Sequence, residues 1–144
     1  MEQPGKMDAE ISLRTVALRW MEEIWRPGGM AHFDDLHSFD FTDHSPAGRA
    51  TDREAYRAGI LDLYTAFPDF TAVTEDLLLD VSAGKAAVRW RTAGTHRGPF
   101  LGFAPSGQVI HFTGIEIIRV ENGKIVERWG EWDGLSLLAQ LGEA

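Results

Sequence analysis

Apolar positions recur at helical spacing in the first part of the chain. Between Ile11 and Trp25 they fall three or four residues apart, with charged residues on the other side. This spacing is typical of a helix that buries one face. The residues Pro27-Gly28-Gly29 end the predicted helix, and a short second helix is expected from Met30 to Leu36.

A third helix is expected after the loop of residues 45–50. Thr51 and Glu54 have the spacing of a capping box, in which the threonine side chain accepts from a first-turn N–H group. Apolar residues at helical spacing follow, and Pro68 ends the helix. A fourth, short helix is expected from Gly134 to Leu141, with Asp133 as its N-cap.

Alternation of apolar and polar residues predicts strands in the rest of the chain. The alternating segments are 38–44, 70–81, 85–96 and the two runs on either side of Glu121-Asn122-Gly123-Lys124. Asn-Gly between two apolar runs is a strong hairpin signal, because both central residues of a type I′ turn need positive φ. Helices followed by a meander indicate an α+β fold.

Four charged residues interrupt the apolar pattern of this last hairpin, namely Glu116, Arg128, Glu131 and Asp133. A charge in a mostly apolar strand must be paired, face water, or serve a function. The position of Glu116 and Arg128 on facing strands therefore makes them candidates either for acid/base chemistry or for a structural ion pair at the sheet rim.

Composition narrows the possible functions. The 144 residues carry a net charge of −8 and no cysteine, which excludes disulfides and a cysteine nucleophile and argues against a nucleic-acid partner. One domain spanning residues 1–144 is expected, with residues 1–9 disordered. No segment resembles a membrane span or a signal peptide, so we expect a cytoplasmic protein without a membrane partner.

Several motifs together resemble the SnoaL-like polyketide cyclases of the nuclear-transport-factor-2-like superfold. They are Phe41-Thr42-Asp43-His44, Ala66-Phe67-Pro68-Asp69, Gly94-Thr95-His96-Arg97-Gly98, Pro105-Ser106-Gly107 and the run from Gly114 to Gly142. The resemblance implies a curved antiparallel or mixed sheet, wrapped by three or four helices into a cone with an apolar cavity. It also implies ring closure of a polyketide ester, or a related lyase or isomerase reaction, without metal or cofactor.

The resemblance does not carry the catalytic residues over intact. The family's helper histidine falls on Glu116, and its catalytic aspartate falls on Gly130, which has no side chain. Only a bulge at Gly130 would turn the neighbouring Glu131 inward. The alternative is therefore a non-catalytic domain that binds a small molecule, and a third possibility is an assembly domain whose cavity is filled by side chains.

The candidate site residues fall into two groups. The expected catalytic residues are Glu116, Arg128, His96 and Glu131, although His96 would equally serve as an anchor for the loop that follows it. An apolar or aromatic ligand is expected to contact a set of mostly aromatic side chains, namely His44, Trp20, Tyr64, Trp90, Phe112 and Trp132.

Two further expectations concern the surface. If Glu116 faces inward, Val109, Ile115 and Ile117 face outward on the convex side of the sheet, which predicts a homodimer through that face. His32 and His37 lie in a short polar segment and are expected to be solvated.

Overall fold

A computed structural model describes residues 5–142. Five strands form one open, mixed sheet in the order β1-β5-β4-β3-β2. The strands are β1 (His37–Asp43), β2 (Thr71–Asp80), β3 (Lys85–Thr95), β4 (Val109–Glu121) and β5 (Lys124–Trp132). All neighbours are antiparallel except β1 and β5, which run parallel. The α+β fold expected from the sequence is confirmed.

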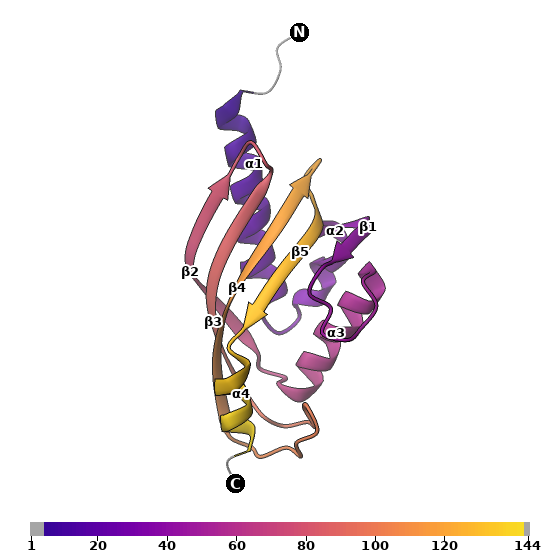
Figure 1. Cartoon of the computed structure of the whole chain (residues 1–144), viewed down its shortest axis with the longest axis vertical. Helices are drawn as coiled ribbons and strands as arrows, with labels where there is room; N and C mark the ends of the chain where they lie inside the picture. Colours follow the sequence, from indigo (N-terminus) through magenta and orange to yellow (C-terminus); the bar gives the residue numbers. More distant parts are fainter. Residues whose placement is uncertain (1–4, 143–144) are drawn as a thin grey trace.

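The helices that precede β2 in the chain cover one face of this sheet, whereas the last helix follows β5 at one end of it (Figure 1). The helices are α1 (Lys6–Arg19), α2 (Phe33–Leu36), α3 (Arg53–Ala66) and α4 (Gly134–Leu141). A π-helical turn, Trp20–Ile24, continues α1, and a 3₁₀ turn, Gly29–His32, precedes α2. Helix α1 begins inside the segment expected to be disordered, of which residues 1–4 lie outside the described part of the chain. Among residues 5–142, no helix is both long and apolar enough to span a bilayer.

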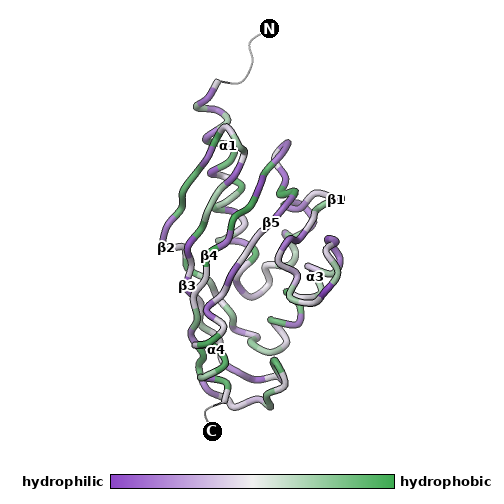
Figure 2. The backbone as a smooth tube through the Cα atoms, in the orientation of Figure 1, coloured by the Kyte–Doolittle hydropathy of each residue, from purple (hydrophilic) through white to green (hydrophobic). Residues whose placement is uncertain are grey.

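The alternation along the strands decides which side chains face the helices. Hydrophobic and hydrophilic residues take turns along the sheet (Figure 2). On β4 the helix-facing positions run from Ile110 through Phe112 to Glu116 and Ile118, while Ile115 and Ile117 face outward. The hairpin turn is confirmed, since Asn122 and Gly123 have φ values of 52° and 75°. Glu116 is therefore turned toward the interior by the same register that buries its apolar neighbours.

The N-cap residue of α4 is the one predicted from the sequence, whereas the N-cap residue of α3 differs from the prediction. Asp133 caps α4 as expected, and its side chain accepts from the Ser136 N–H. At α3 the predicted cap was wrong by one residue, because Asp52 rather than Thr51 accepts from the Ala55 N–H, at 2.8 Å. A carboxylate is as good an N-cap as a hydroxyl, so the sequence allowed either residue.

His37 is buried, so the prediction that it is solvated was wrong. Its ring stacks on Phe33 with centroids 4.1 Å apart, and its Nδ1–H donates to the Phe33 carbonyl at 2.8 Å. Burial lowers the pKa of His37 to about 4, so the ring is neutral at physiological pH. The short helix α2 folds the polar segment inward and places this histidine in an aromatic environment.

Candidate active site

A buried cluster of three charged side chains lies where β1, β4 and β5 meet. Arg128 donates from Nη2 to Glu116 Oε1 and from Nη1 to Asp43 Oδ1, the latter at 2.8 Å. The three side chains are almost fully buried. The parallel pairing of β1 with β5 sets Asp43 opposite Arg128, and β4 brings Glu116 across from the other side. Segments far apart in the sequence thus meet in one ion cluster.

Two carboxylates share the single positive charge of Arg128. Burial is the largest influence on the pKa of Arg128 and lowers it, but the interactions with Glu116, Tyr56 and Asp43 together outweigh burial, and the net effect is a raised pKa. The guanidinium also lies over the ring of Tyr56, 5.0 Å from its centroid. Burial raises the pKa of Tyr56, so this phenol stays protonated. Arg128 is therefore a fixed cation beside two acidic groups.

Gly130 leaves the space that this ion pair occupies. In the sheet it lies opposite Glu116, and a Cβ atom built on it would be 2.5 Å from Glu116 Oε1 and closer still to Arg128 Nη2. Its backbone N–H donates to Ser45 Oγ at 2.9 Å. The pair of Glu116 and Arg128 therefore fills the volume in which the sequence comparison placed the family's aspartate side chain.

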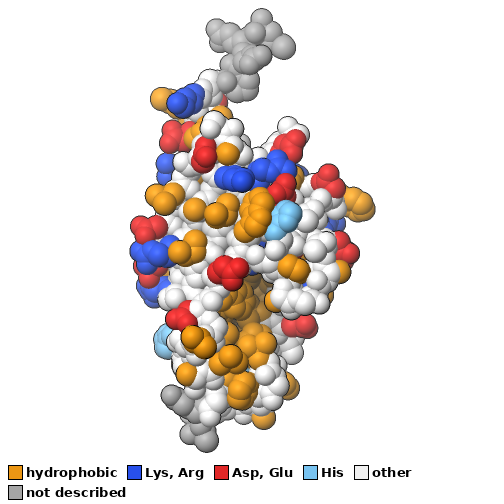
Figure 3. Space-filling model, in the orientation of Figure 1, with side chains coloured by type: hydrophobic (Ala, Val, Ile, Leu, Met, Phe, Trp, Pro, Cys, Tyr) orange, Lys and Arg blue, Asp and Glu red, His pale blue; other side chains and the backbone are white. Residues whose placement is uncertain are grey.

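Two hollows adjoin the cluster. The larger is a cleft of about 520 Å³ that separates the end of β5 and the start of α4 from α3 and its preceding loop. Figure 3 shows this face hollowed, with hydrophobic side chains at the bottom. The smaller is an internal hollow of about 10 Å³, room for about one water molecule. Arg128 and Gly130 line the cleft, whereas Glu116 lines the internal hollow.

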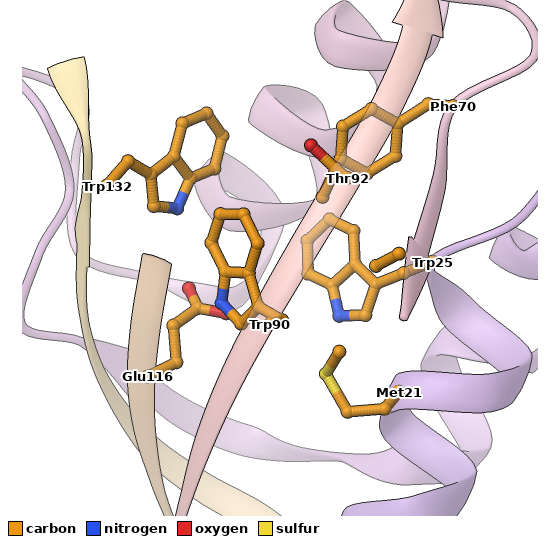
Figure 4. Close-up of a pocket in the computed structure, with 8 residues that line it drawn as sticks. Met21, Trp25, Phe70, Trp90, Thr92, Glu116 and Trp132 are labelled. Carbon is orange, nitrogen blue, oxygen red and sulfur yellow. The ribbon is translucent and has the colours of Figure 1, made fainter. Parts of the chain in front are cut away.

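Trp132 borders both the cleft and the internal hollow. It packs edge-on against Trp90, with centroids 5.7 Å apart, and against Phe112 at 5.1 Å. Figure 4 shows the Glu116 carboxylate turned toward the indoles of Trp90 and Trp132. The Trp90 indole N–H and the Tyr56 hydroxyl have no hydrogen-bond partner within residues 5–142. Each such buried donor calls for a partner, such as an ordered water molecule or a ligand.

The four expected catalytic residues do not converge. Glu116 and Arg128 come together as described. Glu131 lies in regular register opposite Ile115, without a bulge at Gly130, and is exposed at the cleft. His96 lines neither hollow. Its Nδ1 accepts from the Ser106 N–H at 3.3 Å, so its contacts are those of an anchor for the loop of residues 97–107.

The six expected ligand contacts also divide. His44 lines the cleft, Trp90 lines the internal hollow, and Trp132 lines both. Trp20 and Phe112 are buried behind them, and the Tyr64 hydroxyl is held by the carbonyl oxygens of Ile24 and Arg26 at 2.6 and 2.8 Å. These last three support the walls of the site.

Sequence reasoning missed three residues of the site. Asp43 was named only within the motif Phe41-Thr42-Asp43-His44, although it shares a strand face with the buried Phe41, and that pattern would have placed it inside. Tyr56 was not considered as a site residue. Arg49 in the loop before α3 was not considered, and only the structure brings it to the cleft.

The comparisons with known proteins agree with this architecture. The family model described as SnoaL-like polyketide cyclase matches residues 15–141. Comparison with curated proteins gave no significant match.

Several solved structures share the fold. One is IdmH from Streptomyces antibioticus, provisionally described as a polyketide cyclase, with 29% identity and a TM-score of 0.78 over 91% of this chain and 99% of that one. A protein from Jannaschia sp. CCS1, provisionally described as a SnoaL-like polyketide cyclase, shows 21% identity and a TM-score of 0.84 over 100% and 99%. AclR from Streptomyces galilaeus, provisionally described as a hydroxylase, shows 23% identity and a TM-score of 0.80 over 93% and 83%. With a family model covering residues 15–141, the chain belongs to the SnoaL-like polyketide cyclase family.

Proposed function

We propose that this protein catalyses a proton-transfer reaction, such as ring closure of a polyketide-like ester or a related lyase or isomerase step. The observation that carries the proposal is the buried Glu116–Arg128 pair, in which Arg128 lines the cleft and Glu116 lies behind it on the internal hollow. It supplies a carboxylate and a fixed cation in a site from which the family's aspartate is missing.

The chemistry follows from what each group does. The Glu116 carboxylate takes a proton from the carbon between two carbonyl groups, and the enolate oxygen is stabilised by Arg128. In a cyclase the enolate carbon then bonds to a second carbonyl carbon, and Glu116 returns its proton to the alkoxide that forms. Asp43 keeps Arg128 in place throughout.

A movement of Trp132 is part of this proposal. The internal hollow beside Glu116 holds only about one water molecule, so a substrate in the cleft meets Arg128 first. Rotation of the indole, which lines both spaces, would join them and expose the carboxylate. Substrate size is then limited by how far Trp132 can move.

The direct test is turnover of an aromatic polyketide methyl ester, with ring closure followed by chromatography. We expect wild-type protein to accelerate closure and Glu116→Gln to reduce the rate by about 10²-fold or more, the usual contribution of a general base. Arg128 keeps Asp43 as its partner in this variant, and thermal unfolding checks that the fold is intact. Equal rates for the two proteins would remove Glu116 from the mechanism.

The second candidate function is binding without catalysis, which Gly130 favours because it lacks the carboxylate of the family. A thermal-shift screen with flat aromatic ligands finds the ligands that bind, since such a ligand raises the unfolding temperature under either function, and a turnover assay of each hit then distinguishes the two. Tight binding without turnover would support the binding protein.

We also propose that the chain forms a homodimer through the exposed sheet face and, as the sequence predicts, acts in the cytoplasm.

A further inference from the structure

Arg49 carries a charge that the proposed reaction does not use. It lines the cleft, and its guanidinium has no acidic partner within residues 5–142. The next two arginines along the chain, Arg53 and Arg57, both reach Asp34, at 3.7 and 3.0 Å. In a chain with a net charge of −8, an arginine that faces a cleft without an acidic neighbour is available to a ligand.

The backbone before Arg49 holds it at this position. Its N–H donates to the Pro46 carbonyl at 3.0 Å, which closes a tight turn. Both central residues of the turn have positive φ, 51° at Ala47 and 88° at Gly48. Residues other than glycine rarely adopt a positive φ, and Ala47 itself lines the cleft. The turn therefore holds a strained residue at the wall of the site.

A missing side chain on α3 makes room for the guanidinium. A Cβ atom added to Gly59 would lie 2.5 Å from Arg49 Cζ and 2.6 Å from Nε. The flat face of the guanidinium thus rests directly on the helix backbone. This contact limits the freedom of a long side chain, and less entropy is then lost when it binds an anion.

The other side chains of the cleft wall indicate which chemical class of ligand it can bind. Most of its larger side chains are apolar, including Leu63, Phe100 and Leu137. Glu131 is the one acidic residue that lines it, and it forms no ion pair with Arg49 within 4.0 Å among the described residues. Glu131 therefore does not pair with the positive charge of Arg49, which stays available to a ligand that bears one negative group.

We infer that Arg49 binds a carboxylate on the ligand, so that the cleft takes an aromatic or polyketide-like acid in preference to its neutral analogue. The planar guanidinium fork matches the two oxygens of a carboxylate. The inference rests on the proposed function only in that the cleft is taken as the ligand site.

The test compares two probes that differ only in charge, 2-naphthoate and 2-naphthamide, by titration calorimetry at neutral pH. We expect wild-type protein to bind the acid about tenfold more tightly than the amide. Arg49→Gln should remove this preference while leaving amide binding unchanged, and Arg49→Lys should keep part of it. Arg26→Gln, a change at an exposed arginine away from the cleft, should have no effect. Thermal unfolding verifies that each variant is folded.

The outcomes separate this inference from the proposed function. Equal binding of acid and amide to wild-type protein, or a preference that survives in Arg49→Gln, would overturn the role of Arg49 and leave the proposed catalysis standing. A preference that depends on Arg49, in a protein that closes no ring, would support the inference and count against catalysis. Binding of neither probe would count against the inference.

Discussion

At the scale of single residues, Arg128 holds the buried ion cluster together. Its two terminal nitrogens hold two carboxylates from different strands, so each of the three side chains compensates the burial of the others. Removing one member of a buried ion cluster leaves an uncompensated charge, which commonly costs about 3–5 kcal/mol. The same packing explains why position 130 is a glycine, since any larger residue would compete with the ion pair for space.

A first prediction concerns that glycine. Gly130→Ala should lower the free energy of unfolding by about 1–3 kcal/mol, because its methyl group would force Glu116 and Arg128 apart. Gly134→Ala is the matched control, since nothing lies within 4 Å of a Cβ atom there. Urea denaturation of both variants measures the difference. Equal midpoints for the two would show that the pair does not fill this space.

A second prediction concerns His37. The ring is neutral in the native state with a pKa of about 4, whereas a histidine of the unfolded chain binds a proton near its ordinary pKa of 6.5. The unfolded state therefore binds more protons between these values, and the stability that the neutral ring contributes is present above pH 6.5 and lost as the pH falls toward 4. Between about pH 7 and pH 4.5 the loss should be about 2 kcal/mol.

The control for this pH effect is His37→Phe, which keeps an aromatic ring against Phe33 but cannot bind a proton. Urea denaturation at several pH values gives the free energy of unfolding for each protein. Its decrease between pH 7 and pH 4.5 should be smaller in the variant by about 2 kcal/mol. Parallel pH profiles for the two proteins would show that His37 is not the group that titrates.

At the scale of single elements, local sequence patterns predicted the features that depend on residues close together in the chain. The hairpin of β4 and β5 follows from Asn122-Gly123, and the inward position of Glu116 follows from alternation along β4. The parallel pairing of β1 with β5 has no local signal, because the partners are 85 residues apart at Asp43 and Arg128. For that reason the sequence predicted the Glu116–Arg128 pair but not its third member.

The cap of α3 gives the prediction at this scale. Asp52→Ala should destabilise the protein by about 1 kcal/mol, because it removes the acceptor for the Ala55 N–H. Thr51→Ala should change stability little, since within residues 5–142 Thr51 contributes only its backbone carbonyl, as an acceptor for the Asp43 N–H. Thermal unfolding of the two variants decides between the residues, and a larger loss in Thr51→Ala would reverse the assignment.

At the scale of the whole molecule, the exposed face of the sheet carries apolar side chains that have no role in the cleft. One cross-strand row of this face, from β2 to β5, consists of Leu78, Ala87, Ile117 and Trp129. On the same face Ile115 is 54% and Val109 55% exposed. An apolar strip of this extent is unusual on a monomer, which supports the proposed dimer.

Association through this face is tested with Ile117→Lys. We expect wild-type protein to sediment as a dimer and the variant as a monomer, because a buried unpaired charge at the centre of an interface is costly. Leu135→Lys, at a position on α4 that is 85% exposed and off the sheet face, should leave the dimer intact. A monomeric wild-type protein, or a dimeric Ile117→Lys variant, would refute this interface.

The most direct measurement of the central claim is proton exchange at the acidic carbon of an aromatic β-keto ester in deuterated buffer, followed by nuclear magnetic resonance. If Glu116 is the base, wild-type protein should accelerate exchange over buffer, and Glu116→Gln should lose about 10²–10⁴-fold of that rate. Exchange that proceeds equally fast in the Glu116→Gln protein would contradict the assignment of the buried pair as the reactive centre.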